Sequence, residues 1–336
     1  MTRTPRPPRI VRWLSCAEQL LGEAAPRLNA LNVFPVPDAD TGSNMHATMA
    51  AAHAAVAVGS ATDIGAVLQE AGAAALSCAR GNSGTLLAVM LAGMADALRG
   101  REALTAPALA EALVRADTAA HTALSDPREG TILSVLTAGR VSVQATLARA
   151  EAESRPAQTR AVLEEAVVRA VQDAHEAVRR TQGQLEELTR AAVVDAGALG
   201  LLLVFEALRC VVLDVEPDPT LAADLSGYAE GAAAEEPSAE GGVEVMCTIE
   251  LDPLGAATLR HRLTEVGDSV IVAPTRRGED PQDPVPWRVH VHVPEAPLAL
   301  DLFEEAGEPQ DLAVTALDGG HQDDDGHHHD HDHDGH

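Results

Sequence analysis

Apolar residues recur at three- and four-residue spacing over the first two thirds of the chain. From about residue 9 to residue 213 the sequence is rich in Ala, Leu, Val, Arg and Glu and has few β-branched runs, a pattern that predicts amphipathic helices. Polar or glycine-containing breaks divide this segment into roughly eight helices of about 12–22 residues, which we expect to pack as an antiparallel bundle or barrel. The breaks fall at residues 32–44, 59–60, 81–84, 100, 126–130, 155–156 and 195–197.

The pattern changes beyond residue 214. Residues 215–242 are acidic and rich in Pro, Gly and Ala, which predicts a linker. A domain over residues 243–317 follows, in which extended segments alternate with helices in the order βαββαβ. This order predicts a small ferredoxin-like α+β unit whose first and third strands are neighbours at the sheet centre. The expected strands are 243–251, 269–273, 286–293 and 310–315, and the expected helices are 253–266 and 296–306.

Charge and composition narrow the functional classes. The 336 residues contain 51 acidic and 24 basic side chains, for a net charge of −27, and this argues against nucleic acid as a partner. Every basic side chain is Arg, because the chain has no Lys. Mechanisms that need a Schiff-base lysine or a P-loop lysine are therefore excluded. Aromatic residues make up 2% of the chain, too few for a base-stacking platform.

Cysteine spacing and the apolar runs predict a cytoplasmic protein without stable membrane insertion. The four cysteines have no CxxC spacing, so reduced thiols are expected. The basic, Pro-rich start is followed by no uninterrupted apolar segment, and the most apolar stretch, residues 196–205, is short. Neither a signal peptide nor a spanning helix fits these patterns.

The most informative segment for chemistry is residues 31–45. Asp38 and Asp40 lie in a Pro-stiffened loop before a helix expected to begin near Ser43, with the amide oxygens of Asn32 and Asn44 close by. Hard oxygen ligands on a rigid loop suit Mg²⁺, and the amides of a helix N-terminus suit phosphate. An ordinary turn with an N-cap is the alternative. A calcium EF-hand fits less well, because its twelfth position would be methionine.

Three further loops have the same build. Residues 78–85 place Arg80 and an Asn-Ser pair between glycines, and residues 126–131 and 194–197 also lead into apolar helices. Each loop read alone is also explained by an N-cap with a glycine turn. Four such loops in one bundle predict that a common end collects four helix N-termini around one anion.

These motifs, taken together, resemble a known family. Residues 29–45 (NALNVFPVPDADTGSNM), with ARGNSG at 79–84, EGT at 129–131 and VVDAG at 193–197, look like the nucleotide-binding L-subunit domain of dihydroxyacetone (glycerone) kinases, and more closely like the kinase subunit of bacterial fatty acid kinases. The resemblance covers four motifs in the same order across about 200 residues. It implies an eight-helix antiparallel barrel that binds Mg-ATP or Mg-ADP in its mouth.

The resemblance also implies residue roles. Asp38 and Asp40 would be Mg²⁺ ligands and catalytic residues, with Asn32 as a third metal ligand, and Arg80 would neutralise charge during catalysis. Phosphate contacts would come from Thr41, Gly42, Ser43, Asn44, Asn82 and Ser83. The rest of the nucleotide site would be lined by Gly130, Thr131, Asp195, Ala196 and Gly197.

The chain departs from that family pattern in four places. Ala39 replaces the usual glycine between the two aspartates, and Ala198-Leu199 stands where Gly-Gln is common. A methyl group at either place would crowd a loop that approaches phosphate or adopts positive φ. The family's C-terminal domain, which resembles the fatty-acid-carrying partner, is not present in these residues. In its place residues 318–336 form a His/Asp-rich tail, which we expect to be disordered.

Two segments are candidates for Zn²⁺ or Ni²⁺. His290 and His292 share one face of a strand, and Cys247 on the neighbouring strand would complete a Zn²⁺ site. Parity argues against that set, because Cys247 alternates in phase with apolar residues and the histidines do not; the alternative is a buried thiol and two exposed polar residues. A regulatory or dimer-forming role for the open sheet face is equally compatible. The tail, with seven His and six Asp in its last 16 residues, suits Zn²⁺, Ni²⁺ or Co²⁺, or is a solubilising segment.

The leading hypothesis is a Mg-ATP-dependent phosphotransferase of the glycerone kinase type. Its acceptor would be a fatty acid carboxylate presented by a separate lipid-binding protein, or a hydroxyl of dihydroxyacetone, and we expect a homodimer. The alternative is a non-catalytic nucleotide- and metal-binding adaptor. A metal-storage role depends on the tail alone.

Overall fold

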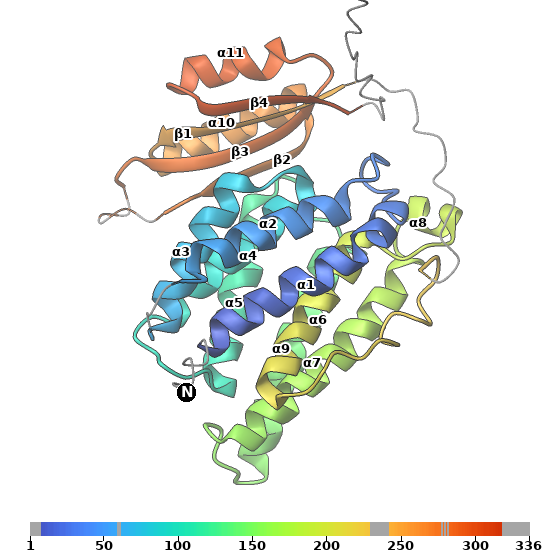
Figure 1. Ribbon diagram of the computed structural model, residues 1–336. Helices are drawn as coiled ribbons and strands as arrows, with labels where there is room; N and C mark the ends of the chain where they lie inside the picture. The colour runs from blue at the N-terminus through green and yellow to red at the C-terminus, as the bar shows by residue number, and fades with distance from the viewer. Residues whose placement is uncertain are drawn as a thin grey trace, which may run out of the picture.

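The computed structural model describes residues 8–58, 62–228, 242–276, 278, 280 and 282–317. The described chain is mainly helical and carries one small antiparallel sheet of four strands. The helices α1–α9 form a helical unit, and the strands with α10 and α11 form a sheet unit that lies over one side of it (Figure 1). The sequence prediction of a mainly helical chain followed by a small α+β unit is confirmed.

The helical unit packs in chain order. Each helix from α1 to α6 contacts the helix that follows it, and α9 contacts both α7 and α1. The packed helices therefore form a closed ring of contacts. At the closure the indole Nε1 of Trp13 in α1 donates to the carbonyl oxygen of Val204 in α9 at 3.0 Å, and Arg12 pairs with Asp214 at 2.8 Å. The helices are α1 (Arg9–Ala30), α2 (Thr41–Val56), α3 (Ile64–Cys78), α4 (Gly81–Ala97), α5 (Ala106–Ala123), α6 (Ile132–Ala152), α7 (Arg160–Thr181), α8 (Glu186–Ala191) and α9 (Ala196–Leu213).

The described residues of this segment contain nine helices, one more than the sequence predicted. The short helix α8 separates α7 from α9 where the sequence pattern predicted one continuous helix. The stretches around residues 41–44, 81–84 and 195–197, expected as loops, also lie largely in the first turns of α2, α4 and α9. Their polar residues therefore stand at helix N-termini, where the first four N–H groups have no partner within the helix.

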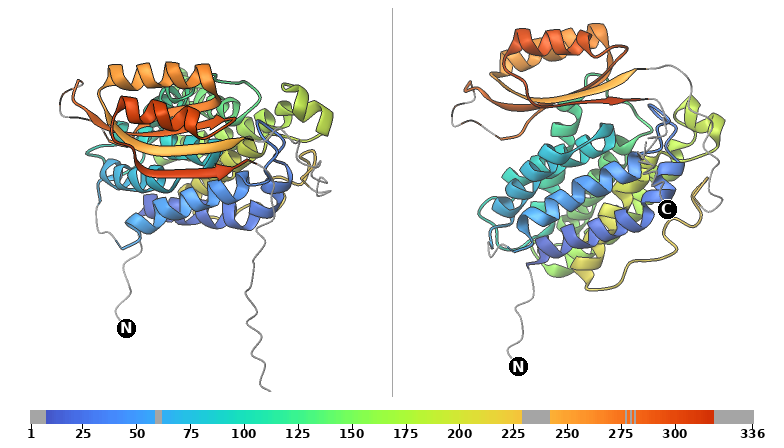
Figure 2. Two further views of the ribbon diagram at one scale, coloured as in Figure 1. Left: turned by 90° about the horizontal axis from the view of Figure 1, so that it is seen from above. Right: turned by 45° about the horizontal axis from the view of Figure 1, so that its top comes forward.

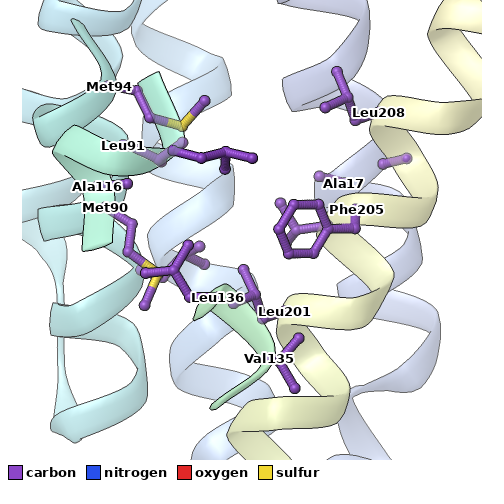
Figure 3. Close-up of a cluster of buried hydrophobic side chains, with 14 of the residues drawn as sticks. Ala17, Met90, Leu91, Met94, Ala116, Val135, Leu136, Leu201, Phe205 and Leu208 are labelled. Carbon is purple, nitrogen blue, oxygen red and sulfur yellow. The ribbon is translucent and has the colours of Figure 1, made fainter. Parts of the chain in front are cut away.

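The interior of the helical unit is filled by apolar side chains. Figure 3 shows Phe205 and Leu201 of α9 pointing toward Met90 and Leu91 of α4, and all four are buried. Among the described residues, α9 is the one helix long and apolar enough to cross a membrane, but 89% of it is buried in this interior. In this structure α9 is a core helix of the helical unit.

The sheet unit has the order β2-β3-β1-β4, with every neighbouring pair antiparallel. The expected neighbours β1 and β3 are paired at the centre, and α10 and α11 cover the face turned away from the helical unit (Figures 1 and 2). All six elements lie within one residue of the predicted bounds. They are β1 (Val243–Leu251), α10 (Pro253–Val266), β2 (Asp268–Pro274), β3 (Val285–Val293), α11 (Pro297–Ala306) and β4 (Gln310–Ala316).

The two units share core. Ile271 and Ala273 of β2 are buried in the same apolar cluster as the helices. The edge of β2 also pairs with the segment that follows α5, where the N–H of Ser125 donates to the carbonyl oxygen of Val270 at 3.1 Å and Leu124 forms a bridge with Ile271. The sheet is therefore fixed to the helical unit by apolar burial and by backbone hydrogen bonds.

The predicted tail at residues 318–336 and its metal site lie outside the described residues, as does most of the predicted linker, 229–241. The proposed division of the chain into domains stays a prediction.

Candidate functional site

The N-termini of α4, α6 and α9 meet at one end of the helical unit. A Cβ atom on Gly197, in the first turn of α9, would lie 3.0 Å from Oγ of Ser83 in α4 and 3.6 Å from Cβ of Ile132 in α6. Glycine at this position therefore lets the α9 backbone approach both neighbours closely. Ser83 and Gly197, which are far apart in the sequence, belong to one cluster.

The N-terminus of α2 joins the same cluster through Asn44. A Cβ on Gly81, which has φ of +60°, would overlap Nδ2 of Asn44, and a Cβ on Gly84 would lie 2.8 Å from Oγ1 of Thr48. Positive φ favours glycine because it has no Cβ. The first turns of α2 and α4 are therefore in direct contact, and the sequence prediction of a common end for four helix N-termini agrees with this geometry.

Asp195 ties two of these helix ends together. Its carboxylate accepts from the N–H of Ala198 at 2.6 Å, which caps α9, and from the N–H of Ile132 at the start of α6. Burial raises the pKa of Asp195 to about 7 despite these two hydrogen bonds. Its own N–H donates to Oγ1 of Thr181 at 2.9 Å. Asp195 therefore fixes the start of α9 against the start of α6. It has this structural role in addition to the predicted role of lining the site.

Asp38 and Asp40 lie on the loop that leads into α2. Burial, and then the charge of Asp40 and a hydrogen bond with it, raise the pKa of Asp38 to about 7. Asn32 holds this loop: its Nδ2 donates to Asp38, and its Oδ1 accepts from Oγ1 of Thr41 at 2.8 Å. Asn32 thus positions Asp38 and the start of α2, and its role as a third Mg²⁺ ligand stays a prediction.

Ala39 and Ala198-Leu199, the two sites where the sequence departs from the family motifs, differ in backbone conformation. Ala39 has φ of +55° and therefore adopts the left-handed conformation that glycine would occupy without strain. Ala198 and Leu199 lie within α9 and are fully buried, so neither needs positive φ. The concern about positive φ thus applies to Ala39 alone.

Several predicted phosphate donors are already engaged. The N–H of Ser43 donates to Oδ1 of Asn29 at 3.0 Å, and the N–H of Asn44 donates to the carbonyl oxygen of Asp40 at 2.9 Å. The N–H of Gly81, which was not among the predicted phosphate contacts, donates to Oε1 of Glu244 at 2.9 Å, across the boundary between the two units. Thr41 and Gly42, by contrast, open α2 and are both buried beside α1.

The remaining predicted residues fall into two groups. Asn82, Ser83, Ala196 and Gly197 lie in the first turns of α4 and α9, at the centre of the cluster. Gly130, with φ of +84°, packs on the connection between α7 and α8, and Thr131 caps α6 through a hydrogen bond from the N–H of Leu133 at 3.4 Å.

Two polar groups at the start of α4 have no partner in the described part of the chain. Oδ1 of Asn82 is buried and has no hydrogen-bond partner among the described residues. An orphaned buried acceptor of this kind is rare and costly. Arg80, the N-cap residue, is exposed beside it and has no hydrogen-bond or ion-pair partner in the described part of the chain. The cluster therefore offers helix N-terminal donors, an acidic pair and a free guanidinium at one end of the helices.

Sequence reasoning missed Glu244, and its parity argument against Cys247 is confirmed. In the register of β1 and β3, Glu244 pairs with His292, Met246 with His290 and Cys247 with Val289. Directly paired residues share a face, so Cys247 points into the apolar core under α10 and α11, where burial raises its pKa to about 12. Cys247 and the two histidines are not brought together.

Glu244 takes the place of the cysteine in that group. Donor atoms of Glu244, His290 and His292 all lie within 4.8 Å of one another, a set that could hold a divalent cation. The histidines are buried, not exposed as the alternative expected. Burial and His290 lower the pKa of His292 to about 4. Burial opposes ionisation of Glu244, but its hydrogen bond with His290 keeps its pKa below the usual range. Strand parity was the signal that could have identified Glu244.

Comparisons with known proteins match both units. A family model described as the DAK2 domain matches residues 35–210, and a model described as the middle domain of FakA-like fatty acid kinase proteins matches residues 240–324.

The curated relatives are longer proteins. Protein YloV of Bacillus subtilis is 31% identical over 303 residues, which are 86% of this chain and 51% of that protein. An uncharacterized protein of Staphylococcus saprophyticus is 34% identical over 188 residues, 56% of this chain and 32% of that one. The chain thus spans about half the length of the first relative and a third of the second.

Among solved structures, the dihydroxyacetone kinase from C. freundii in complex with AMP-PNP and Mg²⁺ gives a TM-score of 0.45 at 19% sequence identity. The similarity covers 62% of this chain and 35% of that one.

Proposed function

The chain belongs to the DAK2-domain family, and from this membership we propose that it is a nucleotide-dependent phosphotransferase whose site is the helix N-terminal cluster. The observation that carries the proposal is the meeting of α2, α4, α6 and α9 at one end, beside the Asp38–Asp40 pair. Backbone N–H groups at helix N-termini bind phosphate oxygens. We also propose that the helical unit is an eight-helix barrel with the short α8 inserted, and that the sheet unit is ferredoxin-like.

The residues fit a nucleotide phosphate group with Mg²⁺. Burial, and then the neighbouring carboxyl group of Asp40, raise the pKa of Asp38, and a divalent cation would offset the repulsion between the two carboxylates. They would hold Mg²⁺, which when bound neutralises phosphate charge. Nδ2 of Asn82 would donate to a phosphate oxygen, whereas its orphaned Oδ1 is an acceptor and would face the cation. The exposed Arg80 would approach the transferred phosphoryl group, where charge develops.

The acceptor that we favour is a fatty acid carboxylate presented by a separate lipid-binding protein. The match of residues 240–324 to the middle domain of FakA-like fatty acid kinase proteins supports this choice over dihydroxyacetone. In the reaction, a carboxylate oxygen forms a bond to the γ-phosphorus while the bond from that phosphorus to the β-phosphate oxygen breaks. The products are an acyl phosphate and ADP. No proton leaves a carboxylate acceptor, so no general base is required of this chain.

Calorimetric titration of ATP tests the site. We expect binding that requires Mg²⁺, and at least a 100-fold loss of affinity in the double variant Asp38→Asn, Asp40→Asn. The matched control is Asp173→Asn with Glu187→Gln, which removes the same charge from exposed positions on α7 and α8. Equal affinities in the two double variants would refute the assignment.

Turnover is tested separately. With Mg-ATP, a fatty acid and a lipid-binding protein, hydroxylamine should trap an acyl hydroxamate. Mg-dependent binding without transfer to a fatty acid or to dihydroxyacetone would instead favour the non-catalytic adaptor. The expected homodimer stays a prediction, which light scattering of the purified chain tests.

A further inference from the structure

A cavity lies between the two units and shares none of the residues of the helix N-terminal cluster. It has a volume of about 410 Å³ and is formed by α3, α4 and α5 on one side and by α10, β2 and β3 on the other. Small-molecule sites typically occupy about 300–1,000 Å³ and occur preferentially where domains meet. β2, which forms part of the wall, is the strand whose edge pairs with the segment after α5 (Figure 1).

Apolar residues form part of the wall of this cavity. Val89, Ala119, Val272 and Trp287 contribute to the lining, and Val89 and Val272 are buried. The indole of Trp287 is fixed by a hydrogen bond from its Nε1 to the carbonyl oxygen of Leu251 at 2.9 Å. Such walls favour the apolar body of a ligand, because its transfer out of water is favourable.

The charged groups of the lining are almost all positive. The lining includes four arginines, Arg99, Arg115, Arg260 and Arg276, against a single acid, Asp96. This excess is contrary to the chain as a whole, whose net charge is −27. Asp96 is paired with Arg99 at 3.1 Å; Arg115, Arg260 and Arg276 are the other three.

Those three arginines have little to bind within the protein. Among the described residues, Arg115 and Arg276 have no hydrogen-bond or ion-pair partner, and Arg260 donates only to the carbonyl oxygen of Thr122. Guanidinium groups bind carboxylate and phosphate oxygens bidentately. Because Arg115 and Arg276 are exposed and come from different units, they would hold an anionic group at the rim while the apolar part enters the cavity.

We propose that this cavity binds an amphipathic anion, an organic molecule with a carboxylate or phosphate head and an apolar body. The proposal does not depend on the phosphotransferase site, which shares none of these residues. Because the ligand would contact both units, its binding would also stabilise their association.

The test uses the full chain and four ligands at concentrations where each is monomeric: decanoate, decyl phosphate, decanol and inorganic phosphate. We expect decanoate or decyl phosphate to bind in calorimetry and to change the fluorescence of Trp287, and decanol and inorganic phosphate to bind at least 10-fold more weakly. The comparison of decanoate with decyl phosphate identifies the preferred head group. Loss of the fluorescence change in Trp287→Phe, with calorimetric binding retained, would locate the ligand at this wall.

Two sets of variants distinguish the cavity from general adsorption. Arg115→Gln with Arg276→Gln should weaken binding of the anion at least 10-fold, whereas Arg179→Gln with Arg190→Gln, on α7 and α8, should leave it unchanged. Ala257→Phe, at an exposed position of the lining, should block the cavity without disturbing the core. Equal binding of decanol and decanoate, unchanged binding in the Arg115 and Arg276 variant, or no binding of either amphiphile would overturn the proposal. The Asp38→Asn, Asp40→Asn variant should bind the anion normally.

Discussion

The buried carboxyl group of Asp195 makes the stability of the helical unit depend on pH. Its pKa is raised by burial from 3.8 to about 7 in the folded protein. The folded protein therefore retains the proton over a range in which the unfolded chain has released it. Since stability falls with pH wherever the folded state binds more protons, Asp195 lowers the free energy of unfolding progressively from about pH 4 to about pH 7. Above that range the loss is constant.

The magnitude follows from the size of the pKa rise. About three pH units at 1.36 kcal/mol each give a total loss of about 4 kcal/mol, of which about 2.5 kcal/mol falls between pH 5 and pH 8. Asp195→Asn removes the titration and keeps an oxygen that can accept from the N–H of Ala198. It forfeits at most the second hydrogen bond, from Ile132, at a cost of about 1 kcal/mol that does not vary with pH.

Urea denaturation of the wild type and Asp195→Asn at pH 5, 6, 7 and 8 measures this effect. We expect the free energy of unfolding of Asp195→Asn, relative to the wild type, to rise by about 2.5 kcal/mol from pH 5 to pH 8. The exposed substitution Asp173→Asn should show no such trend. If the difference between Asp195→Asn and the wild type is the same at every pH, Asp195 is ionised in the folded protein and the argument from burial is wrong.

Three other substitutions test the packing, each by denaturant or thermal unfolding. Gly42→Ala should destabilise the protein by roughly 1–3 kcal/mol. The new Cβ would lie 2.8 Å from Cα of Ala25 and overlap its carbonyl oxygen. A neutral result would mean that α1 and α2 separate readily. Ala39→Gly should raise stability by up to about 1 kcal/mol, since relief of left-handed strain outweighs the added freedom of the unfolded chain, and a clear loss would contradict the positive φ. Glu206→Ala should cost about 3 kcal/mol, the lower end for a buried pair, because it removes a buried carboxylate from the half-buried Arg209. Glu186→Ala, in an exposed pair, should change stability by less than about 0.5 kcal/mol. Similar losses in the two variants would refute the role of burial.

The sheet unit could be predicted closely because its sequence contains strong local signals. Strict alternation over residues 286–293 and prolines at the start of α10 and α11 define the element ends, and the order βαββαβ limits the topology. The helical unit was harder at α8, because a six-residue helix between Gly183 and Ala192 has too few apolar positions to show its own periodicity.

The sequence predicted which residues form the candidate site but not which hydrogen bonds join them. The motifs around Asp38, Asn82 and Gly197 identified which helix ends come together. They could not show that Asn29 takes the N–H of Ser43, because such a contact depends on how α1 crosses α2. Nor could they show that Glu244 accepts a hydrogen bond from the N–H of Gly81, because this contact depends on how the sheet packs on the helices.

The contact between α1 and α9 joins the first and last helices of the helical unit, and this affects the protein while it is being synthesised. Trp13 and Val204 are separated by 191 residues, so at ~5–20 residues per second α9 follows α1 out of the ribosome after about 10–40 s. During that interval the face of α1 that α9 will cover is open to other molecules. That face is therefore open to a chaperone that binds nascent chains, and a chain released before α9 is complete exposes the same surface to proteases.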